Sequence, residues 1–386
     1  MTPTPTTVSA CVTSDMDERT RRAISACYQC GTCTAVCPMG VPVRAIVRGA
    51  QLGIQSLSAE ESRLWGCATC KLCELTCPRS VGIVDVLHYL RVMSAGAKKT
   101  PPKLESAMWG VYEEGNPWGG SKPTRGNWSE GLKVRSALDA KVDYLLYVGC
   151  AASFDSRLQQ VSRSLVRVFN AAGISYGILG NSEDCCGDVV FQAGEEEFLE
   201  ELVQKNLGLF NKTGAQAVVS LSPHCYNMFR DVYPRYGPAP RAIHYTELLS
   251  ELLDGGRLKT TGTGDGTSSV TYHDPCYLGR YHGVYEQPRK ILESIPGIKL
   301  VEMEDSRGNA LCCGGGGGQM WLDVVGERPS HRRVEQALAT GAATLATSCP
   351  YCIQNFEDAA KTKGLEKLGV MDVAEILASR VDGSGV

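Results

Sequence analysis

Eight of the 18 cysteines in this 386-residue chain form two short runs of identical spacing. Each run reads Cys-x2-Cys-x2-Cys-x3-Cys-Pro. Three closely spaced thiolates hold one side of a [4Fe–4S] cluster, and in two-cluster ferredoxins the fourth cysteine of each run serves the other cluster. Two zinc knuckles would not need the third cysteine of each run. The spacing therefore predicts one cubane on Cys27, Cys30, Cys33 and Cys77, and a second on Cys67, Cys70, Cys73 and Cys37.

Nine further cysteines fall into two sets that repeat along the chain. Equivalent cysteines of the two sets lie 126 or 127 residues apart, which indicates a duplicated domain. The first set is Cys150, Cys185, Cys186 and Cys225. The second set is Cys276, Cys312, Cys313, Cys349 and Cys352. Thiolates gathered in this way are metal or cluster ligands.

The first set lacks one cysteine, because the position equivalent to Cys349 is Ser222. Four thiolates suffice for an ordinary [4Fe–4S] cluster or for zinc, and both alternatives stay open. A serine oxygen would be a weak ligand, so a simple substitution is favoured over ligation by Ser222. We expect His224, beside Cys225, to be a solvent-facing turn residue, with ligation as the alternative.

The elements around both sets repeat as well. Residues 142–150 and 268–276 are short apolar runs that end in cysteine, and each predicts a buried strand with its cysteine at the carboxyl end. Helices are expected at 156–170 and 284–294, and further strands near 174–179 and 298–303. Alternating strands and helices predict α/β packing around a largely parallel sheet. The cysteines should then converge at one edge of each sheet.

The stretch from Val41 to Trp65, between the two ferredoxin runs, is expected to be helical because its apolar residues recur at a 3.6-residue spacing. The chain is thus predicted to be multidomain, with a helical two-[4Fe–4S] ferredoxin domain followed by a duplicated α/β domain. The expected ranges are a flexible tail at 1–18, the ferredoxin domain at 19–99, a linker at 100–142, and the two α/β copies at 143–260 and 268–380. The linker contains three tryptophans, Trp109, Trp118 and Trp128. We expect them to hold the linker against the rest of the protein by aromatic packing, with a partner-binding surface as the alternative.

Five glycines, Gly314–Gly318, follow Cys313 directly. They fail the dinucleotide fingerprint because Gln319 stands where its last Gly or Ala belongs. Glycine instead lets backbone N–H groups approach cluster sulfur, with a plain flexible loop as the alternative. His273, Asp274 and Asp188 lie beside the cysteines as either catalytic acids or turn-forming residues, and the structural role is favoured.

The overall composition excludes several classes of protein. With 39 Lys and Arg against 42 Asp and Glu, the net charge of −3 argues against binding nucleic acid. No membrane-spanning segment and no signal peptide are apparent, so a cytoplasmic location is expected. Cys11, in a Pro- and Thr-rich stretch, is interpreted as an incidental thiol.

The pattern Cys…Cys-Cys-Gly…Cys-x2-Cys, complete in the second copy, resembles the cysteine-rich CCG domain pair of heterodisulfide reductase. With the ferredoxin runs in front, the layout resembles its D-type subunit, in which C-like and B-like parts are fused. It is also similar to iron–sulfur subunits of glycolate oxidase and anaerobic glycerol-3-phosphate dehydrogenase, and to the electron-transfer subunit of class II benzoyl-CoA reductase complexes. The resemblance implies a noncubane [4Fe–4S] cluster on the five cysteines of the second set.

These features predict an iron–sulfur electron-transfer subunit of a cytosolic multi-subunit oxidoreductase. The expected partners are a flavin-containing, heterodisulfide reductase A-like subunit or catalytic reductase subunits, because the chain carries no P-loop or flavin fingerprint. The alternative is a terminal heterodisulfide or thiol reductase with a catalytic noncubane cluster. The incomplete first set argues against that alternative, and a zinc-bearing scaffold would require empty ferredoxin runs.

Overall fold

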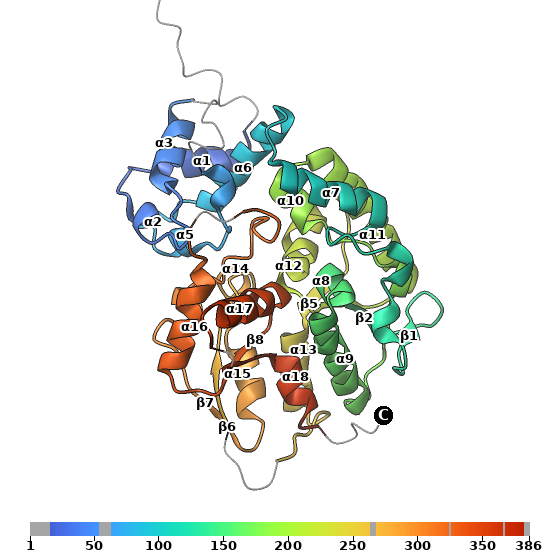
Figure 1. Ribbon diagram of the computed structural model, residues 1–386. Coiled ribbons are helices and arrows are strands. Elements are labelled where there is room, and N and C mark those ends of the chain that lie inside the picture. The colour runs from blue at the N-terminus through green and yellow to red at the C-terminus, as the bar shows by residue number, and fades with distance from the viewer. Residues whose placement is uncertain (1–15, 54–62, 263–267, 324–325, 366, 382–386) are drawn as a thin grey trace, which may run out of the picture.

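The computed structural model describes residues 16–53, 63–262, 268–323, 326–365 and 367–381. Cys11 and the middle of the predicted helical stretch, residues 54–62, lie outside the described residues. Figure 1 shows a helical N-terminal part in blue above two α/β parts, the first in green and yellow and the second in orange and red. The predicted architecture, a helical ferredoxin domain followed by a duplicated α/β domain, is confirmed.

Three helices form the frame of the ferredoxin part, and they pack on one another. The apolar spacing that predicts a helix after Val41 buries Val43, Ile46 and Val47 almost completely. Two one-turn helices carry Cys33 and Cys73 against this frame. The elements are α1 (Glu18–Ala26), α2 (Thr32–Ala35), α3 (Val43–Gln51), η1 (Leu64–Gly66), α5 (Leu72–Leu75) and α6 (Ile83–Gly96).

The segment predicted as a linker is more structured than its composition indicates. It contains α7 (Pro102–Glu114), whose buried face packs on the first α/β part, then η2 (Lys122–Thr124) and η3 (Asn127–Ser129). It ends in β1 (Arg135–Ser136), which joins the first sheet. Trp128 is buried and Trp118 contacts Trp321, as the aromatic-packing interpretation requires, but Trp109 is 56% exposed.

Both α/β parts are built on purely parallel sheets with the same strand order. The first has the order β1-β3-β2-β4-β5 and the second β7-β6-β8-β9, so β2 is equivalent to β6 and β4 to β8. The first sheet consists of β1, β2 (Tyr144–Tyr147), β3 (Tyr176–Ile178), β4 (Ala217–Ser220) and β5 (Arg241–His244). The second consists of β6 (Ser268–Tyr272), β7 (Ile298–Leu300), β8 (Thr344–Thr347) and β9 (Gly369–Asp372).

Helices cover the sheets and join the two copies. In the first copy they are α8 (Gly149–Phe154), α9 (Ser156–Ala171), η4 (Gly180–Ser182), α10 (Asp188–Ala193), α11 (Glu196–Thr213), α12 (Pro223–Asn227), η5 (Met228–Val232), η6 (Tyr233–Arg235) and α13 (Tyr245–Asp254). In the second they are α14 (Gly279–His282), α15 (Glu286–Glu293), η7 (Arg307–Asn309), α16 (Pro329–Ala339), α17 (Pro350–Thr362) and α18 (Val373–Ala378).

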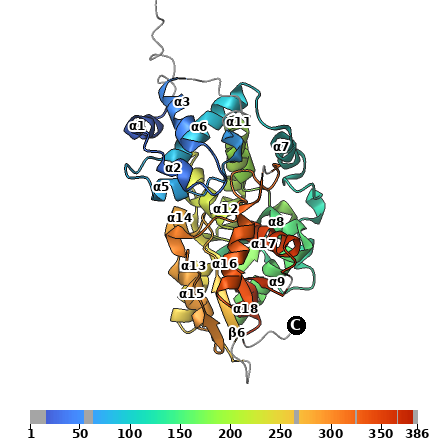
Figure 2. The same ribbon diagram turned by 60° about the vertical axis from the view of Figure 1, so that its left-hand side comes forward.

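One apolar core runs through both copies, because α9 packs on α18 and α13 packs on α15 (Figures 1 and 2). At this interface the guanidinium of Arg157 bonds Glu357 at 2.7 Å and Glu375 at 2.6 Å. Because the two sheets share a core, their cysteine-bearing edges are held in a fixed relation. Among the described residues, no helix is both long enough and apolar enough to cross a membrane.

Candidate iron–sulfur sites

The two ferredoxin loops share an unusual backbone conformation. Gln29 and Gly31 in the first loop, and Thr69 and Lys71 in the second, all have positive φ angles, between 48° and 88°. Non-glycine residues rarely adopt this conformation. Such turns direct successive backbone N–H groups into an anion-binding concavity. The N–H of Thr69 donates to the Cys67 sulfur at 3.3 Å, so the loop is built to receive negatively charged sulfur.

The charge on the fourth cysteine of each run acts on residues near the other run. Burial raises the pKa of Cys73, and the neighbouring thiolates of Cys67, Cys70 and Cys37 raise it further. Burial also raises the pKa of the Tyr28 hydroxyl, together with charge on Cys30 and Cys77. The exchange of the fourth cysteines between the two clusters stays a prediction.

After the fourth cysteine of each run, a backbone N–H group again donates a hydrogen bond to cysteine sulfur. Val41 N donates to the Cys37 sulfur at 3.4 Å, and Val81 N donates to the Cys77 sulfur at 3.5 Å. Proline follows each of these cysteines, which fixes the turn that brings the N–H group back to the sulfur. Hydrogen bonds to sulfur raise the potential of an iron–sulfur cluster.

The four cysteines of the first α/β copy line one enclosed cavity. Cys150 lies in the first turn of α8 after β2, Cys185 and Cys186 precede α10, and Cys225 lies in α12 after β4. All four therefore come from segments that follow the carboxyl ends of strands. All four are buried. Gly187, with φ of +87°, donates its N–H to the Cys185 sulfur at 3.4 Å.

Ser222 lies in this cavity wall, but the structure also gives its side chain a capping role. The hydroxyl oxygen accepts a hydrogen bond from His224 N at 3.3 Å, at the N-terminus of α12. Ser, Thr, Asp and Asn are the usual residues at such a position. This role accounts for a serine at the position of Cys349 without ligation.

The five cysteines of the second copy are gathered in the same way. All are buried, and the Cys352 thiol donates to the Cys313 sulfur at 3.2 Å. Gly314, with φ of +86°, donates its N–H to the Cys312 sulfur at 3.2 Å, as predicted for the first glycine of the run. The members of this set are Cys276, Cys312, Cys313, Cys349 and Cys352.

The chemistry of these donors suits iron and sulfide. The predicted ligands are all thiols, the soft donors that hold iron–sulfur clusters. Backbone N–H groups point at the sulfur atoms in all four groups of cysteines, as a negatively charged cluster requires. Within the described part of the chain, no three Cys, His, Asp or Glu side chains are arranged as ligands of a single metal ion.

The second ferredoxin set lies directly against the second α/β set. The Cys70 side chain packs in the same buried cluster as Cys312. Cys70, Cys276 and Cys312 form one buried apolar cluster with Ala68 and Tyr277. Two predicted cluster sites from different domains are thus in contact through their own ligands.

His224 lies between the two α/β sets, and the expectation that it faces solvent is wrong. Only 4% of it is exposed, and its Nδ1 lies 3.1 Å from Asp188 Oδ2. Burial alone would lower the pKa of His224, but the Asp188 carboxylate and the Cys349 thiol hold it well above its usual range. The imidazole also packs 4.6 Å from Tyr351, its equivalent in the second copy. The residues next to His224 in the sequence do not indicate that its side chain is buried between the two copies.

The other candidate acids have structural partners. Asp274 is held by Arg289 at 2.7 and 2.9 Å and accepts from Arg307 N, so it fixes a turn. His273 accepts from Arg333 Nε through its Nδ1, and its Nε2 lies 3.5 Å from the Cys352 sulfur. Asp188 begins α10 and holds His224.

Two other glycines of the run, Gly316 and Gly317, serve domain docking. A Cβ on Gly316 would lie 2.5 Å from the Ala68 carbonyl oxygen, and one on Gly317 would overlap the Cys67 carbonyl. The glycines therefore let the second α/β copy approach the backbone of the second ferredoxin loop. Gln319 Nε2 donates to Trp65 O at 2.5 Å in the same interface.

Sequence reasoning missed three arginines around the sites, of which Arg91 and Arg125 are buried and Arg280 is partly buried. Arg91 donates to backbone oxygens of all three parts, namely Leu64, Cys67, Gln192 and Gly317, at 2.9 to 3.3 Å. Arg125 donates to the Cys150 sulfur at 3.4 Å and to Glu183 Oε1 at 2.8 Å. Arg280 donates to Cys70 O at 2.5 Å. Only Arg280, four residues after Cys276, lies near a cysteine in sequence.

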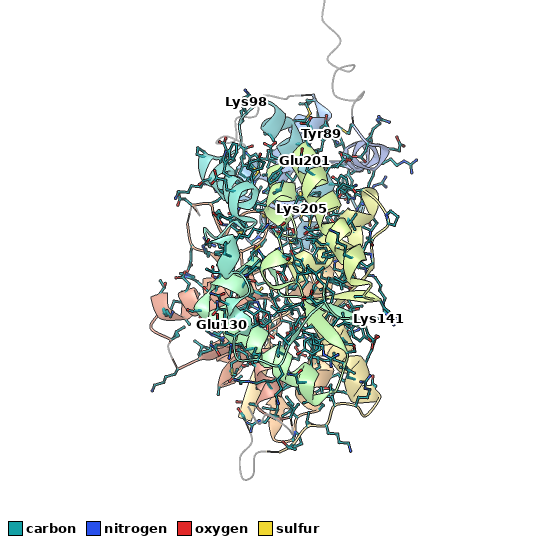
Figure 3. All side chains as sticks on the ribbon, turned by 90° about the vertical axis from the view of Figure 1, so that its right-hand side faces the viewer. Tyr89, Lys98, Glu130, Lys141, Glu201 and Lys205 are labelled. Atoms are coloured by element: carbon teal, nitrogen blue, oxygen red, sulfur yellow. The ribbon has the colours of Figure 1, made fainter. Side chains whose placement is uncertain are left out.

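Near the cysteines of the first α/β copy, two lysines neutralise the charge of the buried Asp184. Its carboxylate pairs with Lys122 and Lys205, both at 2.5 Å. Figure 3 labels Lys205 and Glu201 on α11, on the outer face of the first α/β part. Hydrogen bonds and charges from these lysines lower the pKa of Asp184 although burial raises it.

Two family profiles match the chain. The profile described as "Cysteine-rich domain" (CCG) matches residues 144–230 and 270–357, and the one described as "4Fe-4S dicluster domain" matches residues 26–81. The cysteine-rich profile therefore covers all nine cysteines of the two α/β sets, and the dicluster profile covers both ferredoxin loops.

Several curated proteins are similar over most of the chain. The "Probable iron-sulfur-binding oxidoreductase FadF" of Bacillus subtilis is 38% identical over 84% of this chain and 47% of its own length. The "EtfAB:quinone oxidoreductase" of Syntrophomonas wolfei is 34% identical over 81% of this chain and 46% of its own. The chain thus spans about half the length of these two relatives.

A third relative matches over most of its own length as well. It is the D-type subunit of the dihydromethanophenazine:CoB--CoM heterodisulfide reductase of Methanosarcina acetivorans, 32% identical over 76% of this chain and 72% of its own length. Its similarity, the ferredoxin-type profile and the paired CCG profiles agree with the order of parts in the structure. This chain belongs to the family of heterodisulfide reductase D-type iron–sulfur oxidoreductase subunits.

Proposed function

We propose that this chain is the iron–sulfur electron-transfer subunit of a multi-subunit oxidoreductase. It would exchange electrons with a flavin-containing, heterodisulfide reductase A-like subunit or with catalytic reductase subunits. Iron–sulfur clusters supply reversible one-electron chemistry, while the protein sets their spacing, burial and potential. Reduced thiols are required as ligands, so we propose that it works in the cytoplasm.

Each set of thiols is proposed to hold a particular group. The ferredoxin sets hold two [4Fe–4S] cubanes with exchanged fourth cysteines. The five thiols of the second copy hold a noncubane [4Fe–4S] cluster. The four thiols of the first copy, with Ser222 as a helix cap, hold a further [4Fe–4S] cluster or zinc.

The contact between Cys70 and Cys312 is the observation that carries the proposal. It joins the second ferredoxin set to the second α/β set, because predicted ligands of both sites lie in one buried cluster. His224 then spans from Cys349 to the first set, where it lines the same cavity as Cys150. Thiols of both ferredoxin sets also share one apolar cluster, so the four groups would form one connected series inside the protein.

We propose that a partner docks over the first ferredoxin set. Cys30 is exposed, whereas Cys67, Cys70 and Cys73 are buried. The Tyr28 side chain, 59% exposed, contacts the Cys30 thiol. The outer end of the series is thus open to a partner, while its inner end is enclosed.

The isolated chain tests the relay proposal. Under anaerobic conditions, dithionite should bleach its visible iron–sulfur absorption. The reduced chain should neither reduce NAD(P)⁺ nor turn over small disulfides faster than dithionite does without protein, because no substrate site is proposed in this subunit. The iron-free chain serves as the control. Rapid disulfide turnover by the purified single chain would contradict the relay role.

One observation favours a second candidate, a terminal heterodisulfide or thiol reductase. The buried Asp188–His224 pair lies against Cys349 and the cavity of the first copy, where a proton donor to a thiolate product would be needed. The disulfide assay above separates this candidate from the relay.

A further inference from the structure

The guanidinium of Arg280 is inserted between the ferredoxin part and the second α/β copy. Its Nε donates to Cys70 O at 2.5 Å, and its Nη1 donates to Gly308 O at 3.0 Å and Ala310 O at 2.7 Å. All three acceptors are neutral backbone carbonyls. They hold the side chain in place without neutralising its charge.

No ion pair among the described residues includes Arg280. Its Nη2 is buried and has no hydrogen-bond partner in the protein. The charges that act most strongly on it are the thiolates of Cys70, Cys276 and Cys312, which raise its pKa. A buried donor without a partner is costly, so this N–H group points to an acceptor that the thiol sets would bring.

Arg91, beside Cys67, and Arg333, beside His273, likewise make no ion pair among the described residues and each has a buried N–H group without a partner. Two other arginines near the sites are neutralised. Arg125, beside Cys150, is paired with Glu183 at 2.8 Å. Arg289, near Cys276 in sequence, is paired with Asp274 and Glu302. The first α/β set therefore lies beside a neutralised pair, whereas the junction of Cys70 and Cys312 lies beside an unneutralised cation.

A cluster held by thiolates becomes more negative when it is reduced, and a buried cation nearby favours that state because charges interact strongly at low dielectric. This inference rests on the proposed function. We propose that the charge of Arg280 raises the reduction potentials of the clusters at the Cys70–Cys312 junction above the potential of the cluster held by the first α/β set. Electrons would then gather at this junction.

The test is a redox titration of the full chain, followed by electron paramagnetic resonance under anaerobic conditions. In Arg280→Gln, the one-electron reduction equilibrium of the second α/β site should become at least about tenfold less favourable, a shift of about 59 mV. Arg280→Met, which keeps an unbranched stem, should shift it in the same direction. Arg280→Lys retains the charge and should recover most of the wild-type potential.

Arg157→Gln is the matched control. It removes a partly buried arginine from the interface of the two copies, but Arg157 is already paired with Glu357 and Glu375. Its potentials should equal those of the wild type. The inference would be overturned if the Gln and Met variants contained their clusters but kept the wild-type potentials. It would also be overturned if the potential of the Lys variant shifted as far as that of the Gln variant. If the wild type itself held no cluster at these sites, the proposed function would fail instead.

Discussion

Replacing Arg91 with Ala should lower the free energy of unfolding by at least about 4 kcal/mol. The wild-type guanidinium is 1% exposed and donates to four backbone oxygens from the ferredoxin part and both α/β copies. Each buried acceptor left without a partner costs about 1–3 kcal/mol, and the truncation also leaves a cavity. The midpoint of anaerobic urea unfolding measures the loss.

Arg19→Ala provides the comparison. Arg19 belongs to the same part of the chain, but it is 69% exposed and makes one surface pair with Asp85. Such pairs contribute at most about 1 kcal/mol. If Arg91→Ala lost no more stability than Arg19→Ala, Arg91 would not be the residue that joins the three parts.

Replacing Cys349 with Ser should remove the cluster of the second α/β site and about four iron atoms per chain. Cys349 is 2% exposed and in contact with Cys352 and His224. A thiol is a soft ligand that ionises near neutral pH, whereas a serine hydroxyl is neither soft nor acidic. The ferredoxin signals in electron paramagnetic resonance should persist, because their ligands belong to another part of the chain.

Ser222→Ala is the control at the equivalent position of the first copy. Because the Ser222 hydroxyl caps α12, its removal should leave the iron content unchanged and cost about 1 kcal/mol of stability. A Cys349→Ser protein with full iron and an unchanged spectrum would contradict the assigned ligand set. Loss of iron from Ser222→Ala would show that the serine is a ligand.

The cysteine spacing and the repeat could be predicted because both can be read directly from positions in the sequence. The spacing of the eight ferredoxin cysteines determines the local turns that hold them. The 127-residue offset aligns β4 with β8 and Ser222 with Cys349. Apolar periodicity likewise predicts α3, since this helix buries one face. The turns and this helix depend on neighbours a few residues apart.

Features that depend on docking could not be predicted in this way. The composition around α7 predicts a linker, although the buried face of this helix packs on the first copy. The sequence predicts His224 at the surface, yet it is enclosed because Tyr277 and Tyr351 of the second copy cover it. Arg280 and the docking role of Gly316 and Gly317 arise only where two domains meet. No pattern within either domain marks such a contact.

The most direct test of the account is the metal content of chain prepared without exposure to air. The two ferredoxin sets and the second α/β set together predict about 12 iron atoms per chain with matching acid-labile sulfide, four for each cluster. The first α/β set should add either about four more or one zinc ion. Protein with zinc but no iron would contradict the claim that these thiols form an electron-transfer series.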